Sequence, residues 1–371
     1  MERYRFKNDG LATDTSMSQE ECESGCSLFF FPLLELPLHQ QLQLQQLSFI
    51  NTDLEPLLMR EKHLWMPVDH GSSTGFFTLW IYWTHLPEEE TARVIGTLKP
   101  FWNNDHEGGF GGGPKQLGHT ATNYASCLTL ALLGTSEAWE AVDRQKLYRF
   151  FLARKYATSG AFTAHDGGEA DVRVTYCVIS IASLHTRVVL VVNQRTKLTV
   201  DTHSVPLQHS TFSKQLIRFA TYLSLLHWLA NRQMPFEGGY QGRTNKLVDG
   251  CYSFWQGAVP ALLAQVVRQR YGDEVPYQCH QENLQRYILL CGQEITGGLR
   301  DKPGKPRDHY HSCYCLSGLS VAQHGDGRGE PVVYGDVSNL MKPTHPAYNI
   351  GYDKAMKTIE YFKTKGPFQP E

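Results

Sequence analysis

The chain has 371 residues, enough for one large hydrophobic core or two ordinary domains. Hydrophobic residues make up 41% and charged residues 19%, which is typical of a globular protein. The 35 Lys and Arg residues nearly balance the 37 Asp and Glu residues, so the chain has no overall positive charge to attract nucleic acid. An anionic ligand would therefore need a local cluster of cations.

Residues 1–60 carry no functional signal and are expected to form a poorly defined N-terminal segment. The apolar run 27–38 is too short to span a bilayer and contains two prolines and a Glu, so we expect no membrane span. The sequence contains nine cysteines, an odd number that cannot all form pairs within the chain. Cys127 and Cys177 stand in apolar helical patterns, where cysteine is typically a small buried residue. A reduced, cytoplasmic protein is the simplest interpretation.

Four segments repeat one pattern, a glycine turn followed by a large apolar residue. The turns begin at Gly108, Gly160, Gly238 and Gly297. Eleven residues after these glycines stand His119, Asp171, Asp249 and Asp308. Glycine permits the positive φ that such a turn needs, and Asp is a good N-cap. Each repeat therefore predicts a turn, a loop and a capped helix.

Apolar helical patterns follow the turns at 123–134, 174–184, 252–267 and 312–323, and second helices are expected at 143–156, 219–234 and 283–293. These pairs predict an all-α protein. A straight solenoid of helix hairpins remains open. The repeated turns favour a closed α/α toroid, because they gather the N-termini of the inner helices around one rim.

One stretch does not fit the repeat. The interval between Gly160 and Gly238 is longer than the others, and residues 185–210 are rich in Val and Thr and contain no glycine turn. We therefore expect a toroid domain over 61–371 with an atypical replacement at about 185–218, where the toroid could be incomplete.

Asp249, Cys251 and His311 are the sharpest candidates for a chemical site. Asp249 and Cys251 begin one inner helix and His311 begins the next, so a carboxylate, a thiolate and an imidazole can converge. One oxygen, one sulfur and one nitrogen ligand suit Zn²⁺ and leave a fourth position open for an incoming thiol. The alternative is a helix cap, a small core residue and an ordinary first-turn histidine.

Cations stand close to these residues in the sequence. Arg243 and Lys246, with Lys305 in the next repeat, lie beside glycine-rich backbone and could bind a diphosphate. Asp301 among these cations could hold Mg²⁺ against the phosphates. The alternative is a solvated basic loop.

Several aromatic side chains follow helical spacing and could line a tunnel for a hydrocarbon tail, although core packing is the more common use of such residues. They are Tyr176, Trp255, Tyr310 and Tyr314.

The segments GGYQGRTNKLVDGCYSFWQ (238–256) and GGLRDKPGKPRDHYHSCYCLSGLSVAQH (297–324) resemble signature segments of protein farnesyltransferase β subunits. Segments at 107–125, 167–177 and 343–351 are similar to that family too. The resemblance covers roughly 86–184 and 230–365. It implies an α/α toroid with Zn²⁺ and Mg²⁺, a separate α subunit, and transfer of farnesyl from farnesyl diphosphate to the Cys thiol of a C-terminal CaaX sequence.

The resemblance also implies roles for individual residues. It matches Asp249, Cys251 and His311 to the zinc ligands, Asp301 to the carboxylate linked to Mg²⁺, and Arg173 to a group near the carboxyl terminus of the acceptor peptide. The aromatic residues that it matches to lipid- or peptide-facing positions are Tyr176, Trp255, Tyr310 and Tyr314. It matches Arg243, Lys246 and Tyr252 to the diphosphate contacts, and Tyr252 also to a catalytic residue.

Two departures from the family pattern keep other functions open. Unrelated sequence stands at 185–218, and residues 79–83 only partly match the helix that limits lipid length. The alternatives are a geranylgeranyl-transferring β subunit, or a catalytically impaired splice variant that only binds the α subunit. A terpene-cyclase-like protein would need an acidic initiating motif, and we find no convincing one.

Overall fold

The computed structural model describes residues 86–104, 108–156, 161–168, 170, 172–185, 224–271, 279–294 and 298–365. These residues form helices joined by loops, and the loops contain isolated antiparallel β-bridges. Among the described residues, no β-strand extends beyond such a bridge. The predicted N-terminal segment 1–60 lies outside the described residues, as does the atypical stretch 185–218 except for His185.

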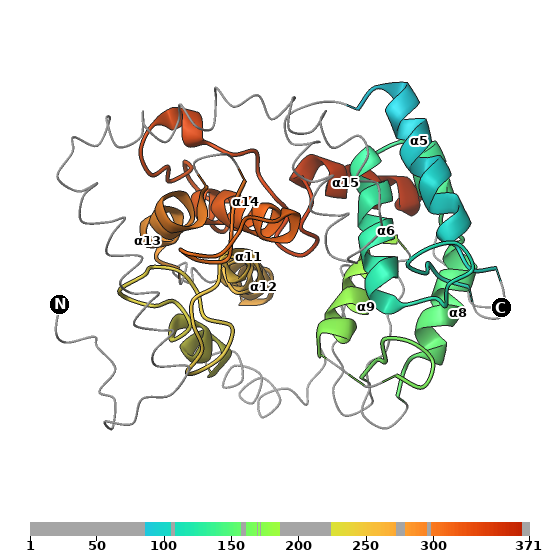
Figure 1. Ribbon diagram of the computed structural model, residues 1–371, viewed down its shortest axis with the longest axis horizontal. Helices are drawn as coiled ribbons and strands as arrows, with labels where there is room; N and C mark the ends of the chain where they lie inside the picture. Colours follow the sequence, from blue (N-terminus) through green and yellow to red (C-terminus); the bar gives the residue numbers. More distant parts are fainter. Residues whose placement is uncertain are drawn as a thin grey trace. The chain divides into compact units, whose positions relative to one another are not determined.

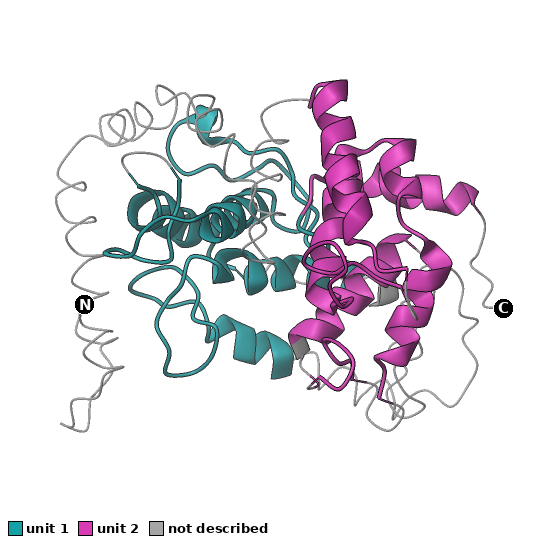
Figure 2. Cartoon of the chain, turned by 45° about the vertical axis from the view of Figure 1, so that its right-hand side comes forward, with its two compact units in different colours: residues 1–65, 208–349 teal, residues 66–207, 350–371 magenta. Residues whose placement is uncertain are grey.

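The chain divides into two compact units (Figure 2). Unit 1 contains residues 1–65 and 208–349, and unit 2 contains residues 66–207 and 350–371. The described residues 350–365, near the end of the sequence, therefore belong to unit 2. The predicted domain boundaries at 61 and 371 stay a prediction.

Unit 2 is built from helices joined by loops (Figure 1). Its elements are α5 (Glu88–Leu98), η2 (Lys99–Phe101), α6 (Thr120–Leu133), α7 (Ser136–Glu140), α8 (Arg144–Ala153), α9 (Val172–His185) and α15 (Tyr352–Thr364). Helix α6 is buried nearly all round and packs against α9 and α15, as expected of an inner helix. It ends at Gly134, whose left-handed backbone (φ 69°) suits only glycine without strain.

Unit 1 contains the helices predicted for the third and fourth repeats. Residues 224–230 are helical, and the further elements are α11 (Tyr252–Trp255), α12 (Ala258–Tyr271), α13 (Gln281–Arg286), the π-helical turn η3 (Tyr287–Gly292), α14 (His309–His324) and η4 (Val337–Asn339). Helix α14 is buried along almost its whole length and packs against α11, α12 and α13. It is thus an inner helix of this unit.

The predicted helix at 252–267 is wrong in one respect, because the structure interrupts it between α11 and α12. Pro260 has no N–H to donate to the carbonyl of Gln256, so a continuous helix would lose a hydrogen bond there. The expected helix at 283–293 likewise changes to a π-helical turn after Arg286.

The glycine turns are confirmed where the structure describes them. The φ angles of Gly108, Gly238 and Gly298 are about 80°, in the region that favours glycine. Gly298 is the second glycine of its turn, and the predicted turn starts Gly160 and Gly297 lie outside the described residues. In the third and fourth repeats, the amides of Asp249 and Asp308 donate to the carbonyls of Tyr240 and Leu299, at 3.2 and 3.3 Å. Equal hydrogen bonds at equal offsets show that these loops are structural repeats.

The predicted Asp cap is confirmed in the fourth repeat, and a histidine takes this place in the first repeat. The Asp308 carboxylate accepts the amide of His311 and caps α14, and the His119 ring accepts the amide of Ala121 at the start of α6. Asp249 accepts the amide of Cys251 in the same way, although α11 begins only at Tyr252. Asp171 lies outside the described residues.

Candidate functional site

The three predicted metal ligands come from the starts of two neighbouring inner helices. Asp249 and Cys251 directly precede α11, and His311 is the third residue of α14. Because α11 packs against α14, the loop before one helix faces the first turn of the other. The structure therefore brings together residues about sixty positions apart in the sequence.

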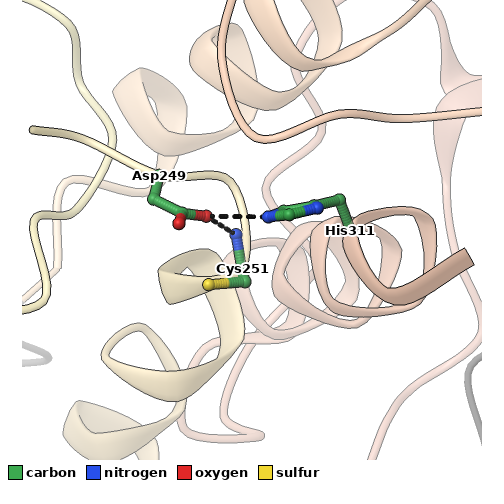
Figure 3. A group of neighbouring side chains, drawn as sticks. All are labelled: Asp249, Cys251 and His311. Carbon is green, nitrogen blue, oxygen red and sulfur yellow. Dashed lines mark hydrogen bonds and ion pairs between the residues drawn. The ribbon is translucent and has the colours of Figure 1, made fainter. Parts of the chain in front are cut away.

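Asp249, Cys251 and His311 form a compact cluster of potential ligands (Figure 3). One ligand atom from each residue lies within 4.8 Å of the other two. His311 Nε2 is 3.3 Å from Asp249 Oδ1, which also accepts the Cys251 amide at 2.8 Å. Cys251 is buried, whereas the side chains of His311 and Asp249 are 18% and 26% exposed, so the cluster is reachable from outside.

Asp308 holds the imidazole of His311 in place. Its Oδ1 accepts the His311 amide at 2.7 Å, and its Oδ2 lies 2.6 Å from Nδ1 of the same residue. With this carboxylate on Nδ1, the other ring nitrogen, Nε2, faces Asp249, an arrangement that is common around metal-binding histidines. The sequence predicted only a capping role for Asp308, and its contact with the imidazole became visible only in the side-chain geometry.

Hydrogen bonds determine the charges of the cluster. Burial would lower the pKa of His311, but the hydrogen bonds to Asp249 and Asp308 outweigh burial and raise the pKa to about 9. Burial would raise the pKa of Asp249, but its bonds to His311 and Cys251 lower the pKa to about 2. Burial raises the pKa of the Cys251 thiol far above its usual range. Without a metal, the cluster thus holds a carboxylate, an imidazolium and a neutral thiol at pH 7.

Asp301, the candidate Mg²⁺ ligand, lies beside this cluster. Burial and the neighbouring carboxylate of Asp249 raise the pKa of Asp301, and the Lys302 ammonium pairs with its Oδ2. The other carboxylate oxygen is buried without a hydrogen-bond partner. An oxygen of this kind suits a cation ligand. Binding of Mg²⁺ by Asp301 stays a prediction.

The predicted diphosphate contacts lie on exposed loops of unit 1. Arg243 and Lys246 lie in the turn between the bridge partners Gln241 and Val248, and Lys305 lies in the equivalent turn between Arg300 and Arg307. Tyr252 reaches back to the first turn, because a Cβ on Gly242 would stand 2.3 Å from the Tyr252 hydroxyl. The loop with Arg243 and Lys246 leads along the chain to Asp249, so the two cations lie in the same loop as a candidate metal ligand.

Three of the predicted aromatic residues form one cluster next to Cys251. Trp255 donates its Nε1 hydrogen to the Tyr310 hydroxyl at 3.0 Å, and the ring centroid of Tyr314 lies 4.5 Å from that of Trp255 and 4.7 Å from that of Tyr310. An apolar wall thus adjoins the candidate metal ligands. Whether a lipid tail lies on it stays a prediction.

Two of the predicted residues lie in unit 2, on α9. Arg173 is exposed, and the hydroxyl of Tyr176 lies 3.4 Å from that of Tyr124 on α6. Their predicted roles toward peptide and lipid stay predictions.

Comparisons with known proteins agree with the predicted fold. A family model, the prenyltransferase alpha-alpha toroid domain, matches residues 74–206 and 210–350. The Candida albicans protein geranylgeranyltransferase-I, solved in complex with GGPP, has a similar structure with a TM-score of 0.58 and 16% identity, covering 93% of this chain and 98% of that one. The all-α toroid prediction is confirmed. The matched ranges include most of 185–218.

Sequence relatives distinguish two groups of prenyltransferases. The protein farnesyltransferase subunit beta of Pisum sativum is 36% identical over 340 residues, covering 70% of this chain and 80% of that protein. The geranylgeranyl transferase type-2 subunit beta of Saccharomyces cerevisiae is only 25% identical over 305 residues, covering 71% and 89%. The similarity to farnesyltransferase β subunits is thus greater than that to this geranylgeranyl transferase β subunit, as the resemblance in the sequence motifs implied. Among the described helices, none is long and apolar enough to cross a membrane.

Proposed function

The chain belongs to the family of protein farnesyltransferase β subunits, and from this premise we propose that its Asp249–Cys251–His311 cluster binds Zn²⁺ and that the chain transfers farnesyl to the Cys thiol of C-terminal CaaX sequences. The observation that carries the proposal is the meeting of three different donor atoms within 4.8 Å. A bound zinc ion would lower the pKa of an incoming thiol.

The donor set fits zinc better than other common cations. Mg²⁺ and Ca²⁺ prefer oxygen ligands, whereas a thiolate and an imidazole beside one carboxylate suit Zn²⁺. Three protein ligands leave a fourth position for a substrate, which is the pattern of catalytic sites. The open position beside a thiolate, an imidazole and a carboxylate suits an incoming thiol, so we infer a site built for thiol transfer.

In the proposed reaction, a C–S bond forms at C1 of the farnesyl group while its C–O bond to diphosphate breaks. The thiol proton leaves to solvent, and the diphosphate carries away the electron pair of the broken bond. Arg243, Lys246 and Tyr252 would stabilise the charge that develops on the leaving group. Asp301 would hold Mg²⁺ against the same phosphates, and Lys305 would add a further positive charge.

The aromatic cluster of Trp255, Tyr310 and Tyr314 would contact the hydrocarbon chain. It adjoins Cys251, so a lipid lying on it would place its reactive end near the thiol acceptor. For Tyr176 and Arg173, on α9, we propose contacts with lipid and with peptide, respectively. Competition between C15 and C20 diphosphates with one CaaX peptide tests the farnesyl preference, and preferred transfer of the C20 group would contradict it.

A β subunit needs a partner, and we propose a prenyltransferase α subunit in a cytoplasmic heterodimer. Co-expression of both chains, followed by zinc analysis and a CaaX prenylation assay, tests the whole proposal. The expected result is one zinc ion per heterodimer and transfer of farnesyl. A heterodimer with neither zinc nor turnover would instead support a chain that only binds the α subunit.

Lys246→Ala is expected to weaken farnesyl diphosphate binding about tenfold, because a hydrogen bond to a charged group contributes about 1.5 kcal/mol or more. Peptide affinity should change little. Titration calorimetry with each substrate checks this, and Lys342→Ala, an exposed lysine after η4, serves as the control. Equal losses for diphosphate and peptide would leave Lys246 as a surface charge only.

Zinc binding is expected to release about two protons at pH 7, one from Cys251 and one from His311. The His311 pKa of about 9 keeps the imidazole protonated in the metal-free site, and the raised pKa of Cys251 keeps its thiol protonated. Zinc affinity should therefore rise about a hundredfold per pH unit from pH 7 to 9, and less steeply above that. Calorimetry in buffers of different ionisation enthalpy counts the protons. A release near one would mean that His311 is already neutral.

A further inference from the structure

Gly250 stands between the ligands Asp249 and Cys251 in a space that admits no side chain. A Cβ at this position would lie 2.6 Å from Cys315 Sγ and 2.7 Å from the carbonyl oxygen of Arg300. Its φ is not in the left-handed region, so conformational freedom does not explain the glycine. The close approach of neighbouring atoms explains it.

Backbone hydrogen bonds hold the ligand loop in this position. The Gly250 amide donates to the carbonyl of Asp301 at 2.7 Å, and the Tyr287 hydroxyl donates to the same carbonyl at 2.8 Å. Tyr287 is fully buried, so its hydroxyl anchors that carbonyl firmly. The loop can therefore not move away from Arg300 and Asp301 without losing a hydrogen bond.

Cys315 connects this contact to the third ligand. It follows His311 by four residues on α14, so both side chains lie on one face of the helix, one turn apart. Cys315 is fully buried, with its Sγ 3.8 Å from the Arg300 carbonyl oxygen. The cluster of mutually close donor atoms contains Asp249, Cys251 and His311 but not Cys315. Cys315 thus touches the ligand loop without belonging to the cluster.

We propose that the contact between Gly250 and Cys315 is a size-matched spacer that sets the distance between the Asp249–Cys251 loop and His311. Both are positioning residues: the missing side chain on one partner makes room for the sulfur of the other. A larger group on either side would push α14 away from the loop and separate His311 from the other two ligands. This inference rests on the proposed zinc site.

The test compares zinc affinities of the heterodimer, measured by competition with a chromophoric chelator. Gly250→Ala is expected to weaken zinc binding about tenfold or more, as displaced supporting groups do. Cys315→Ala should weaken zinc binding less than Gly250→Ala does, because it removes the spacer sulfur without adding a clash. The double variant should recover part of the loss of Gly250→Ala, since the added methyl group then still meets the Arg300 carbonyl oxygen. Wild-type affinity in Gly250→Ala, or no recovery in the double variant, would overturn the proposal. Gly292→Ala is the control, because a Cβ there meets no atom closer than 3.7 Å.

A second pair of variants keeps the test open if Gly250→Ala does not fold. Cys315→Val enlarges the spacer from the helix side, whereas Cys313→Val enlarges an equally buried residue whose Sγ lies 3.5 Å from Asn349 Nδ2. Only Cys315→Val should weaken zinc binding and alter the visible spectrum of the Co²⁺-substituted protein. Equal effects of both would refute the spacer. A wild-type heterodimer without zinc would instead refute the proposed function itself.

Discussion

Cys251→Ala is expected to lose zinc and at least about a hundredfold of the farnesyl transfer rate while the helices remain folded. The substitution removes the sulfur donor from the cluster, and the two remaining ligands would hold the ion weakly. Stability should fall by only about 1 kcal/mol, because one buried sulfur atom is lost. Metal analysis, a prenylation assay and circular dichroism measure the three effects.

Cys291→Ala is the matched control for this prediction. Cys291 is equally buried in unit 1, but its side chain packs against Val248 and Tyr287 and does not belong to the ligand cluster. It should keep zinc and activity. His311→Ala should resemble Cys251→Ala, because it removes the nitrogen donor. Full activity in either ligand variant would refute the metal assignment.

Asp308→Asn is expected to lower zinc affinity about ten- to hundredfold, the usual effect of removing the carboxylate behind a metal-binding histidine. The substitution keeps an oxygen that can cap α14, since Asn and Asp are similar N-caps. It removes the charge that helps to raise the His311 pKa. Fewer protons should then be released when zinc binds at pH 7. Chelator competition and proton counting by calorimetry provide the two readouts.

Asp143→Asn serves as the control for the capping role. The Asp143 carboxylate caps α8 in unit 2 by accepting the amides of Gln145 and Lys146. Its replacement should leave zinc affinity and proton release as they are. If Asp308→Asn also leaves both unchanged, Asp308 is a helix cap only, and the orientation of His311 does not depend on it.

Local rules explain why the repeats were visible without coordinates. A glycine turn needs positive φ, and a helix start needs an acceptor for its free amides, so Gly238, Gly298 and Asp308 reveal themselves by residue type and spacing. The interruption after Trp255 was missed, although Pro260 carried the signal. The π-helical turn at Tyr287–Gly292 has no comparable signal, because it depends on how that segment packs.

The candidate site also combines features that the sequence predicted with features that only the structure shows. The ligand types and the offset of Asp249 and His311 from their turns were enough to predict a shared ion, because repeats place equivalent positions side by side. The role of Asp308 toward the imidazole needed the side-chain geometry, and so did the contact of Gly250 with Cys315. Neither can be deduced from residue type, since an Asp before a helix is usually only a cap.

From the amino-acid order alone we could predict the repeated glycine turns, the helical class and the three donor types of the candidate site, because each depends on neighbours along the chain or on a constant spacing. The distances among Asp249, Cys251 and His311 became known only from the folded chain, and so did the buried groups that hold them there. Those distances depend on the packing of α11 against α14, where atoms from distant segments must share one space.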